Sequence, residues 1–244
     1  MKKYVNLFVF VFMVGACFSQ GKAQTKSAVS YKNPVVDIAM PDPTVIKAAD
    51  GYFYVYATES TRNVPIMKSK DLVQWTYCNT AFTNKTRPRF EPKAGIWAPD
   101  INYINNKYVL YYAMSVWGGE QTCGIGVATA NSPQGPFTDH GKMFRSNEIG
   151  VQNSIDPSFL QYEGRNYLVW GSFRGIYVIE LTEDGLSLKP GAEKKRIAGT
   201  AFEAAYIHKH GDYYYMFASI GSCCEGIRSC LLYTSPSPRD GATS

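Results

Sequence analysis

Histidine is scarce in this chain and cysteine is not clustered, which excludes the common metal-binding patterns. The 244 residues include three His and six Cys, and no C-x-x-C pair occurs. Structural zinc sites draw four such ligands from short spacings, so a zinc site is not expected. Cys223 and Cys224 are adjacent, but adjacency does not distinguish a disulfide from two buried thiols.

Blocks of like charge and long amphipathic helical patterns are also missing. The formal net charge of +5 is spread along the chain. A nucleic-acid groove needs basic residues clustered with aromatics, so we expect no nucleic-acid partner and interpret the charge as serving solubility. No pattern indicates a protein partner either.

One long apolar segment stands at the N-terminus, from Val5 to Ala16 after Lys2 and Lys3. It predicts a signal peptide over residues 1–24, followed by a polar linker over 25–33. Cleavage after Gln24 would give a secreted or periplasmic protein. Alternatively, the lipobox-like residues before Cys17 would leave that cysteine lipidated and the protein anchored to a membrane.

What the chain has in abundance is aromatic residues, 14% of the total, with 18 Tyr. They gather in four similar segments, each with an acid, an apolar stretch, a turn and an aromatic run. The acids are Asp42, Asp100, Asp156 and Glu203, at intervals of 58, 56 and 47 residues. A repeat of this length with paired strands predicts an all-β protein, a β-propeller whose domain covers residues 34–229.

If the segments are blades, the four acids begin equivalent innermost strands and converge at one end of a central channel. Carboxylates brought together can divide acid and base roles. The alternative is turn chemistry, in which Asp before Pro caps backbone N–H groups. Glu203 argues against that alternative, because its longer side chain is a poor local cap.

The last residues, 230–244, lack the strand, turn, strand rhythm of the rest. They resemble a translated sequencing adapter, so we expect an artefactual tail and a fourth blade that stops after its second strand.

The ordered set of motifs resembles glycoside hydrolase family 43. The resemblance covers about residues 33–229 and rests on PDP at 41–43, WAPDI at 97–101, SIDPS at 154–158, FEA at 202–204 and GSCC at 221–224. It implies a five-bladed propeller, of which about three and a half blades are present here. It also implies action on arabinan or arabinoxylan, and the GSCC segment is most similar to endo-acting arabinanases.

The resemblance further implies a role for each acid. Asp42 is the general base that activates water, Glu203 the general acid, and Asp156 the residue that raises the pKa of Glu203 and orients it. Inversion follows for the family, with base and acid about 6.5–9.5 Å apart. Asp100 matches no catalytic acid and is expected in the pocket wall or in a structural role.

Trp97, with Tyr103 nearby, is a candidate platform for stacking a sugar ring, or else a core residue between blades. No cofactor is expected for the chemistry. The resemblance implies a structural calcium in the central channel, with a histidine ligand from a last blade that this chain does not contain, so no metal ligand is predicted.

Several functions therefore compete. The first is an inverting endo-1,5-α-L-arabinanase. An exo-acting α-L-arabinofuranosidase or β-xylosidase of the same family is the enzymatic alternative. A non-catalytic carbohydrate-binding propeller would have no need of three acids, and a protein-interaction propeller would have no reason to bring them together.

Overall fold

The regular secondary structure of the described residues consists almost entirely of consecutive antiparallel strands. The computed structural model describes residues 30–221 and, for the backbone alone, 228–236. Within these residues there are three sheets of four strands and one of three. The first sheet has β1 (Thr44–Lys47), β2 (Phe53–Tyr56), β3 (Pro65–Ser69) and β4 (Thr76–Thr80). The second has β5 (Gly95–Ile104), β6 (Lys107–Ser115), β7 (Gly124–Ala130) and β8 (Thr138–Arg145). The third has β9 (Ser158–Tyr162), β10 (Arg165–Trp170), β11 (Ile176–Glu180) and β12 (Lys195–Ala198), and the fourth has β13 (Phe202–His210), β14 (Tyr213–Ile220) and β15 (Arg228–Pro236). The short helix α1 (Ser146–Ile149) follows β8.

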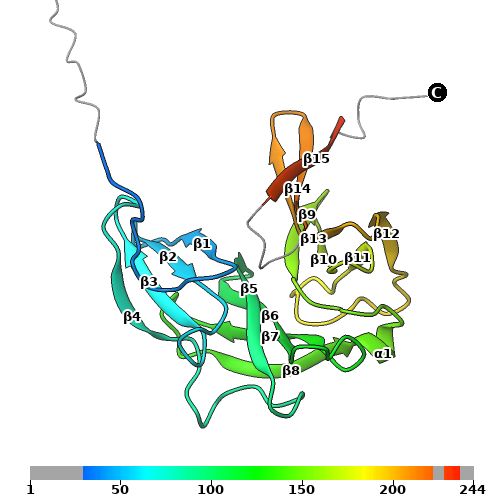
Figure 1. Cartoon of the computed structure of the whole chain (residues 1–244), viewed down its shortest axis with the longest axis horizontal. Helices are drawn as coiled ribbons and strands as arrows, with labels where there is room; N and C mark the ends of the chain where they lie inside the picture. Colours follow the sequence, from blue (N-terminus) through cyan, green and yellow to red (C-terminus); the bar gives the residue numbers. More distant parts are fainter. Residues whose placement is uncertain (1–29, 222–227, 237–244) are drawn as a thin grey trace, which may run out of the picture. The chain divides into compact units, whose positions relative to one another are not determined.

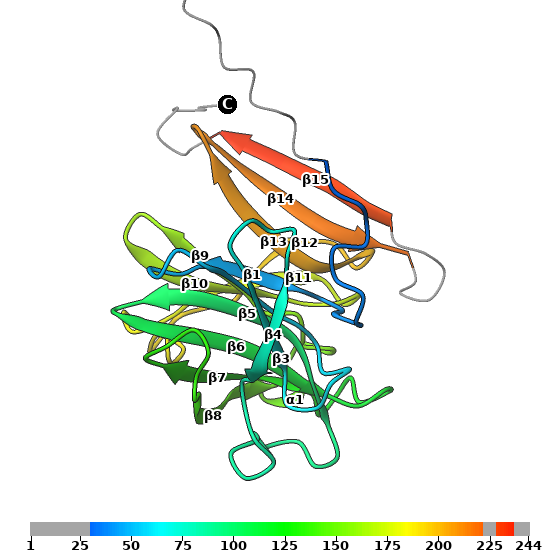
Figure 2. The same ribbon diagram turned by 90° about the vertical axis from the view of Figure 1, so that its left-hand side faces the viewer.

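The first strands of successive sheets lie beside one another. β1 contacts β5, β5 contacts β9 and β9 contacts β13 (Figure 1, Figure 2). In every sheet the later strands follow outward in chain order. Sheets that share one inner edge in this way are the blades of a propeller, so the predicted all-β propeller architecture is confirmed.

Burial explains why the middle strands are apolar along their whole length. Each middle blade has neighbours on both faces, so β6 and β7 are buried at nearly every position, whereas β8 at the outer edge alternates between exposed and half-buried residues. A strand covered on both faces needs a continuous apolar run, and one covered on a single face needs alternation.

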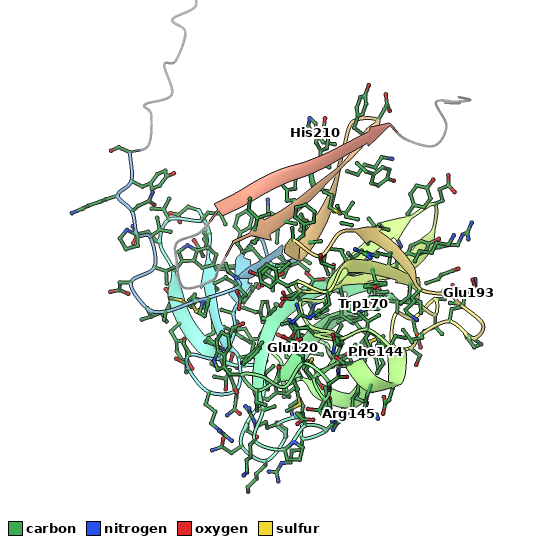
Figure 3. All side chains as sticks on the ribbon, turned by 45° about the vertical axis from the view of Figure 1, so that its right-hand side comes forward. Glu120, Phe144, Arg145, Trp170, Glu193 and His210 are labelled. Atoms are coloured by element: carbon green, nitrogen blue, oxygen red, sulfur yellow. The ribbon has the colours of Figure 1, made fainter. Side chains whose placement is uncertain are left out.

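Large aromatic side chains fill the spaces between the sheets. Between the second and third sheets, Phe144 of β8 lies against Trp170 of β10 with ring centroids 5.1 Å apart (Figure 3). Between the first and second, Phe82 meets Tyr112 edge to face at 5.7 Å. Trp170 serves packing, because its side chain is fully buried.

The end of the fourth sheet differs from the sequence-based expectation. Arg228–Pro236 forms β15, which pairs with β14 along its length (Figure 2). The expectation that the fourth blade stops after its second strand is therefore wrong. Backbone hydrogen bonds to β14 make this strand possible without the apolar periodicity that identified the others. The adapter origin of this segment stays a prediction.

Several sequence-based predictions concern residues outside the described part of the chain. These are the signal peptide, the lipidation of Cys17, most of the linker, the state of Cys223 and Cys224, and residues 237–244. Within residues 30–221 and 228–236, no helix has the length and apolar character needed to cross a bilayer.

The closest packing in the second sheet predicts a strong effect of one added methyl group. A Cβ on Gly126 of β7 would lie 2.3 Å from the hydroxyl oxygen of Tyr112. That ring is fully buried, and its hydroxyl donates to Asp139 at 2.5 Å, so it cannot move aside. We expect Gly126→Ala to lower the free energy of unfolding by about 1–3 kcal/mol, measured by urea denaturation.

Gly199→Ala is the matched control, because the nearest atom to its added Cβ is Phe202 Cε2 at 3.9 Å. Its stability should stay within about 0.5 kcal/mol of wild type. Equal urea midpoints for the two variants would contradict the packing argument.

Candidate active site

In each sheet, one residue at or just before the beginning of the first strand has a left-handed backbone conformation. Asp42, Ala98, Asp156 and Ala204 have φ angles of 49°, 40°, 57° and 53°. The first three precede a proline, and the fourth precedes Ala205. In β5 and β13 the pairing register shifts across this residue, as it does at a β-bulge. The four positions are therefore structurally equivalent, and the kink redirects the side chains around it.

This equivalence corrects the sequence alignment of the four segments. The residue of the second sheet that corresponds to Asp42 and Asp156 is Ala98, and Asp100 lies two positions further along β5. The expectation that all four acids begin equivalent strands is thus wrong for Asp100. Glu203 stands one position before the left-handed residue of its own sheet.

Asp42, Asp156 and Glu203 are close enough to act on one another electrostatically. Burial raises the pKa of Asp156 well above its ordinary value, and the charges of Glu203 and Asp42 raise it further, against a hydrogen bond from the Ala204 N–H. Burial also raises the pKa of Glu203, a hydrogen bond from Ser172 lowers it, and the charge of Asp42 raises it. The structure therefore brings together the three acids that the sequence predicted as catalytic.

The Asp42 carboxylate is exposed and held on one side. Its Oδ2 accepts a hydrogen bond from Thr58 Oγ1 at 2.5 Å. The same hydroxyl accepts from the Ala98 N–H at 2.7 Å, so its hydrogen points toward Asp42. The Thr58 N–H also donates to the Pro41 carbonyl at 2.9 Å. Among the described residues no hydrogen bond reaches Oδ1 of Asp42, and the residue is exposed.

Glu203 is half-buried and is held by the loop that follows β10. Ser172 Oγ donates to its Oε2 at 3.1 Å. Ser172 and Glu203 also form an isolated antiparallel bridge, and the Phe173 N–H donates to the Phe202 carbonyl at 2.9 Å. The acid is thus attached to the third sheet as well as to its own.

Asp100 has a different environment, among the first strands. One carboxylate oxygen accepts from Thr44 Oγ1 at 3.4 Å, and the other accepts from Asn102 Nδ2 and the Phe159 N–H, both at 2.7 Å. Because these bonds join β1, β5 and β9, they agree with the structural role considered for Asp100. Burial raises its pKa to about 6, against the lowering effect of the three hydrogen bonds. Contact with substrate stays a prediction.

The two predicted aromatic residues lie at opposite ends of β5. Trp97 is half-buried and packs on the small cluster that contains Ile155, the neighbour of Asp156. Tyr103 is 56% exposed and pairs with Tyr108 beside the turn after β5. The two residues are six positions apart on the strand, which corresponds to about 20 Å along it. They therefore cannot form one stacking surface.

Sequence reasoning missed Trp117, in the loop between β6 and β7. Its side chain is 82% exposed and meets Trp97 with ring centroids 5.6 Å apart. An aromatic residue before Gly118-Gly119 is a turn signal, which alone gave no reason to place it near the acids. The two indoles are tilted by 52° to each other, and Trp97 packs on the cluster that contains Ile155, the neighbour of Asp156.

Metal binding finds no support in the side chains that the structure describes. They contain no group of three or more His, Cys, Asp and Glu residues that could hold an ion. No step of the chemistry is therefore assigned to a metal, and the calcium implied by the resemblance stays a prediction.

Three blades of this propeller thus carry an acid at the start of the first strand, and the three acids act on one another. The family model described as "Glycosyl hydrolases family 43" matches residues 31–243, and this chain belongs to that family. Its arabinanases are five-bladed propellers, which agrees with the predicted fold.

Several of the similar proteins are named as arabinanases. The extracellular endo-α-(1→5)-L-arabinanase 1 of Bacillus subtilis is 35% identical over 202 residues, which are 77% of this chain and 61% of the relative. A solved α-L-arabinanase of Cellvibrio cellulosa, complexed with arabinohexaose, is 28% identical with a TM-score of 0.70, covering 79% of this chain and 69% of its own. An exo-1,5-α-L-arabinanase from a bovine ruminal metagenomic library is 31% identical with a TM-score of 0.67, covering 81% and 70%. The chain thus spans about three fifths of the curated relative's length.

The buried carboxyl of Asp100 predicts a specific pH dependence of stability. Its pKa is raised from 3.8 to about 6 on folding, so the native state binds more protons than the unfolded state between these values. Stability contributed by this group therefore falls as pH rises through the window. Relative to Asp100→Asn, the wild-type free energy of unfolding should fall by roughly 3 kcal/mol from below pH 4 to above pH 6.

Urea denaturation of both proteins at several pH values measures this difference, and contributions of the other acids cancel in it. Parallel curves for the two proteins would show that Asp100 keeps an ordinary pKa.

Proposed function

We propose that this protein is an inverting glycosidase that cleaves α-1,5-linked L-arabinan within the chain. The observation that carries the proposal is the coupled trio of Asp42, Asp156 and Glu203 at the starts of three first strands. Glycoside hydrolysis by inversion needs one carboxylate as base and one carboxylic acid as proton donor. The named activities of the relatives support arabinan as the substrate.

The environments of the acids assign their roles. Asp42 is exposed and has one oxygen free, so it suits the base that takes a proton from the attacking water. Glu203 is half-buried with a raised pKa, so it keeps its proton for the departing glycosidic oxygen. Water oxygen bonds to the anomeric carbon as the glycosidic C–O bond breaks, and the two acids return to their starting states by exchange with solvent.

Asp156 completes the arrangement as the partner of Glu203. Interaction between neighbouring carboxyl groups is mutual: the charge of Glu203 raises the pKa of Asp156, and Asp156 favours the protonated form of Glu203 whenever it is itself ionised. The Ala204 N–H bond stabilises that ionised form. In this proposed role, Asp156 modulates the pKa of Glu203 and orients its carboxyl group.

The paired indoles of Trp97 and Trp117 are the proposed sugar-stacking surface. A pentose presents C–H groups that pack well on an aromatic face. The exposure of Trp117 leaves that face open to a polysaccharide. Arabinan or arabinoxylan oligosaccharides are the proposed ligands, and the extracellular relative supports export of this protein through its N-terminal segment.

Replacing the acid tests the roles directly. Glu203→Gln keeps the size of the side chain but removes the proton donor, so hydrolysis of linear arabinan should fall by about 10²–10⁴-fold. Binding of arabino-oligosaccharides, measured by calorimetry, should stay close to wild type.

Glu193→Gln is the control, because Glu193 is exposed in the loop between β11 and β12 (Figure 3). It should keep wild-type activity. Wild-type rates in Glu203→Gln would show that another group donates the proton.

Exo action is the second candidate, favoured by the similarity to the ruminal exo-arabinanase. Product analysis on linear arabinan separates the two modes. We expect oligomers of several lengths early in the reaction, because an endo enzyme cuts within the chain. Release of a single short product from the first time point would instead support exo action.

A further inference from the structure

We propose that Ser172 is a positioning residue whose hydroxyl fixes which carboxyl oxygen of Glu203 carries the proton. The inference rests on the proposed role of Glu203 as the general acid. Ser172 itself lies in the loop after β10 and is not an acid.

The geometry leaves the Ser172 hydroxyl little freedom. The residue is 2% exposed, and its Oγ donates to Glu203 Oε2 at 3.1 Å. Backbone contacts flank this bond, through the Ser172–Glu203 bridge and the Phe173 N–H donated to the Phe202 carbonyl. Because these contacts hold the two backbone segments together, the Ser172 hydroxyl has a fixed position relative to the Glu203 carboxyl group.

A chain of hydrogen bonds fixes Ser172 in turn. Asn153 Nδ2 donates to the Ser172 carbonyl at 3.1 Å, and the Asn153 N–H donates to the Glu120 carbonyl at 2.8 Å. The Arg174 guanidinium donates two hydrogen bonds, of 3.0 and 2.8 Å, to the Glu120 carboxylate. Three loops, those carrying Glu120, Asn153 and Ser172, thus form one hydrogen-bonded support beneath the acid.

The first sheet repeats the arrangement, which indicates that it belongs to the site. The Glu59 N–H donates to the Ile96 carbonyl at 3.1 Å, as the Phe173 N–H does to Phe202. By this bond Thr58, which precedes Glu59, corresponds to Ser172, although Thr58 holds an acid of its own sheet and Ser172 an acid of the next sheet. The Thr58 hydroxyl donates to Asp42, the proposed base, so equivalent hydroxyls hold the base and the acid.

The chemical consequence follows from the single proton of a carboxylic acid. An oxygen that accepts from Ser172 acts as the carbonyl oxygen of protonated Glu203, so the proton resides on Oε1. When Glu203 is ionised, the same bond stabilises the carboxylate and lowers its pKa, against burial and the charge of Asp42. The titratable groups that act with Glu203 are Asp42, before β1, and Asp156, before β9.

Ser172→Ala removes one oxygen atom and should produce two effects of different kind. The kcat on linear arabinan should fall about tenfold, because the proton is no longer confined to Oε1, while KM changes little. The alkaline limb of the kcat–pH profile should move to higher pH, because the pKa-lowering bond is lost. Ser172→Thr should restore both, because it keeps the hydroxyl that donates to Glu203.

Ser69→Ala is the matched control. Ser69 is also 2% exposed and its hydroxyl donates to a carboxylate, Asp71, at 3.0 Å, but it lies at the end of β3. It should leave kcat and the alkaline limb unchanged. A lower kcat in Ser172→Ala with an unmoved limb would overturn the proposal, because a loss of structure alone gives that result.

A titration independent of arabinan separates this inference from the proposed function. Carbon-13 NMR of labelled Glu carboxyls, with the Glu203 signal identified by its absence in Glu203→Gln, follows the acid directly. The midpoint should be higher in Ser172→Ala than in wild type. An inactive wild type would refute the proposed function while this midpoint still decides the role of Ser172, and equal midpoints would overturn that role.

Discussion

The left-handed residue at the start of each first strand is the constraint on which the site depends. Left-handed backbone is tolerated by Asp but strained for Ala. The two alanines in this conformation, Ala98 and Ala204, donate their N–H groups to Thr58 and to Asp156. The kinks that aim the acids are therefore stabilised by the residues of the site itself, so local backbone strain and site geometry support each other.

Bonds between neighbouring sheets carry this arrangement into the fold. The buried Glu59 carboxylate binds Arg87 at both guanidinium nitrogens and accepts the Ile96 N–H at 3.0 Å. Burial opposes its ionisation, but the bonds from Arg87, Asn63 and Ile96 prevail and lower its pKa. An ion pair satisfied in this way is costly to break on one side, which keeps the Thr58 loop against the second sheet.

Sequence alone predicted the strands well, and it singled out three acids that the structure brings together, for physical reasons. Middle strands covered on both faces must be apolar throughout, so their aromatic runs are visible without a structure. Asp42, Asp156 and Glu203 followed from their places before those runs and from the family resemblance. Asp100 was placed wrongly because the repeat was aligned on its acids, whereas the residue of the second sheet that corresponds to Asp42 and Asp156 is Ala98.

Residues that act through loops could not be found in the same way. Trp117 and Ser172 lie between strands, where no periodicity marks a side chain as near the acids. Trp97 and Tyr103 were paired because they are close in sequence. In an extended strand, however, residues a few positions apart lie far from each other. The strand β15 was missed because its pairing with β14 rests on backbone groups, which every sequence provides.

The same kink also accounts for the use of Glu at one position and Asp at the others. Asp42 and Asp156 are themselves left-handed residues, whereas Glu203 stands one position earlier and leaves the strand from a different point. An additional methylene extends its carboxyl toward the other two. Its side chain also lies under the loop of Ser172, which removes it from solvent, while Asp42 stays exposed. Two carboxyl groups of similar intrinsic acidity thus acquire different environments from their positions relative to one repeated backbone kink, and the proposed opposite roles rest on that difference.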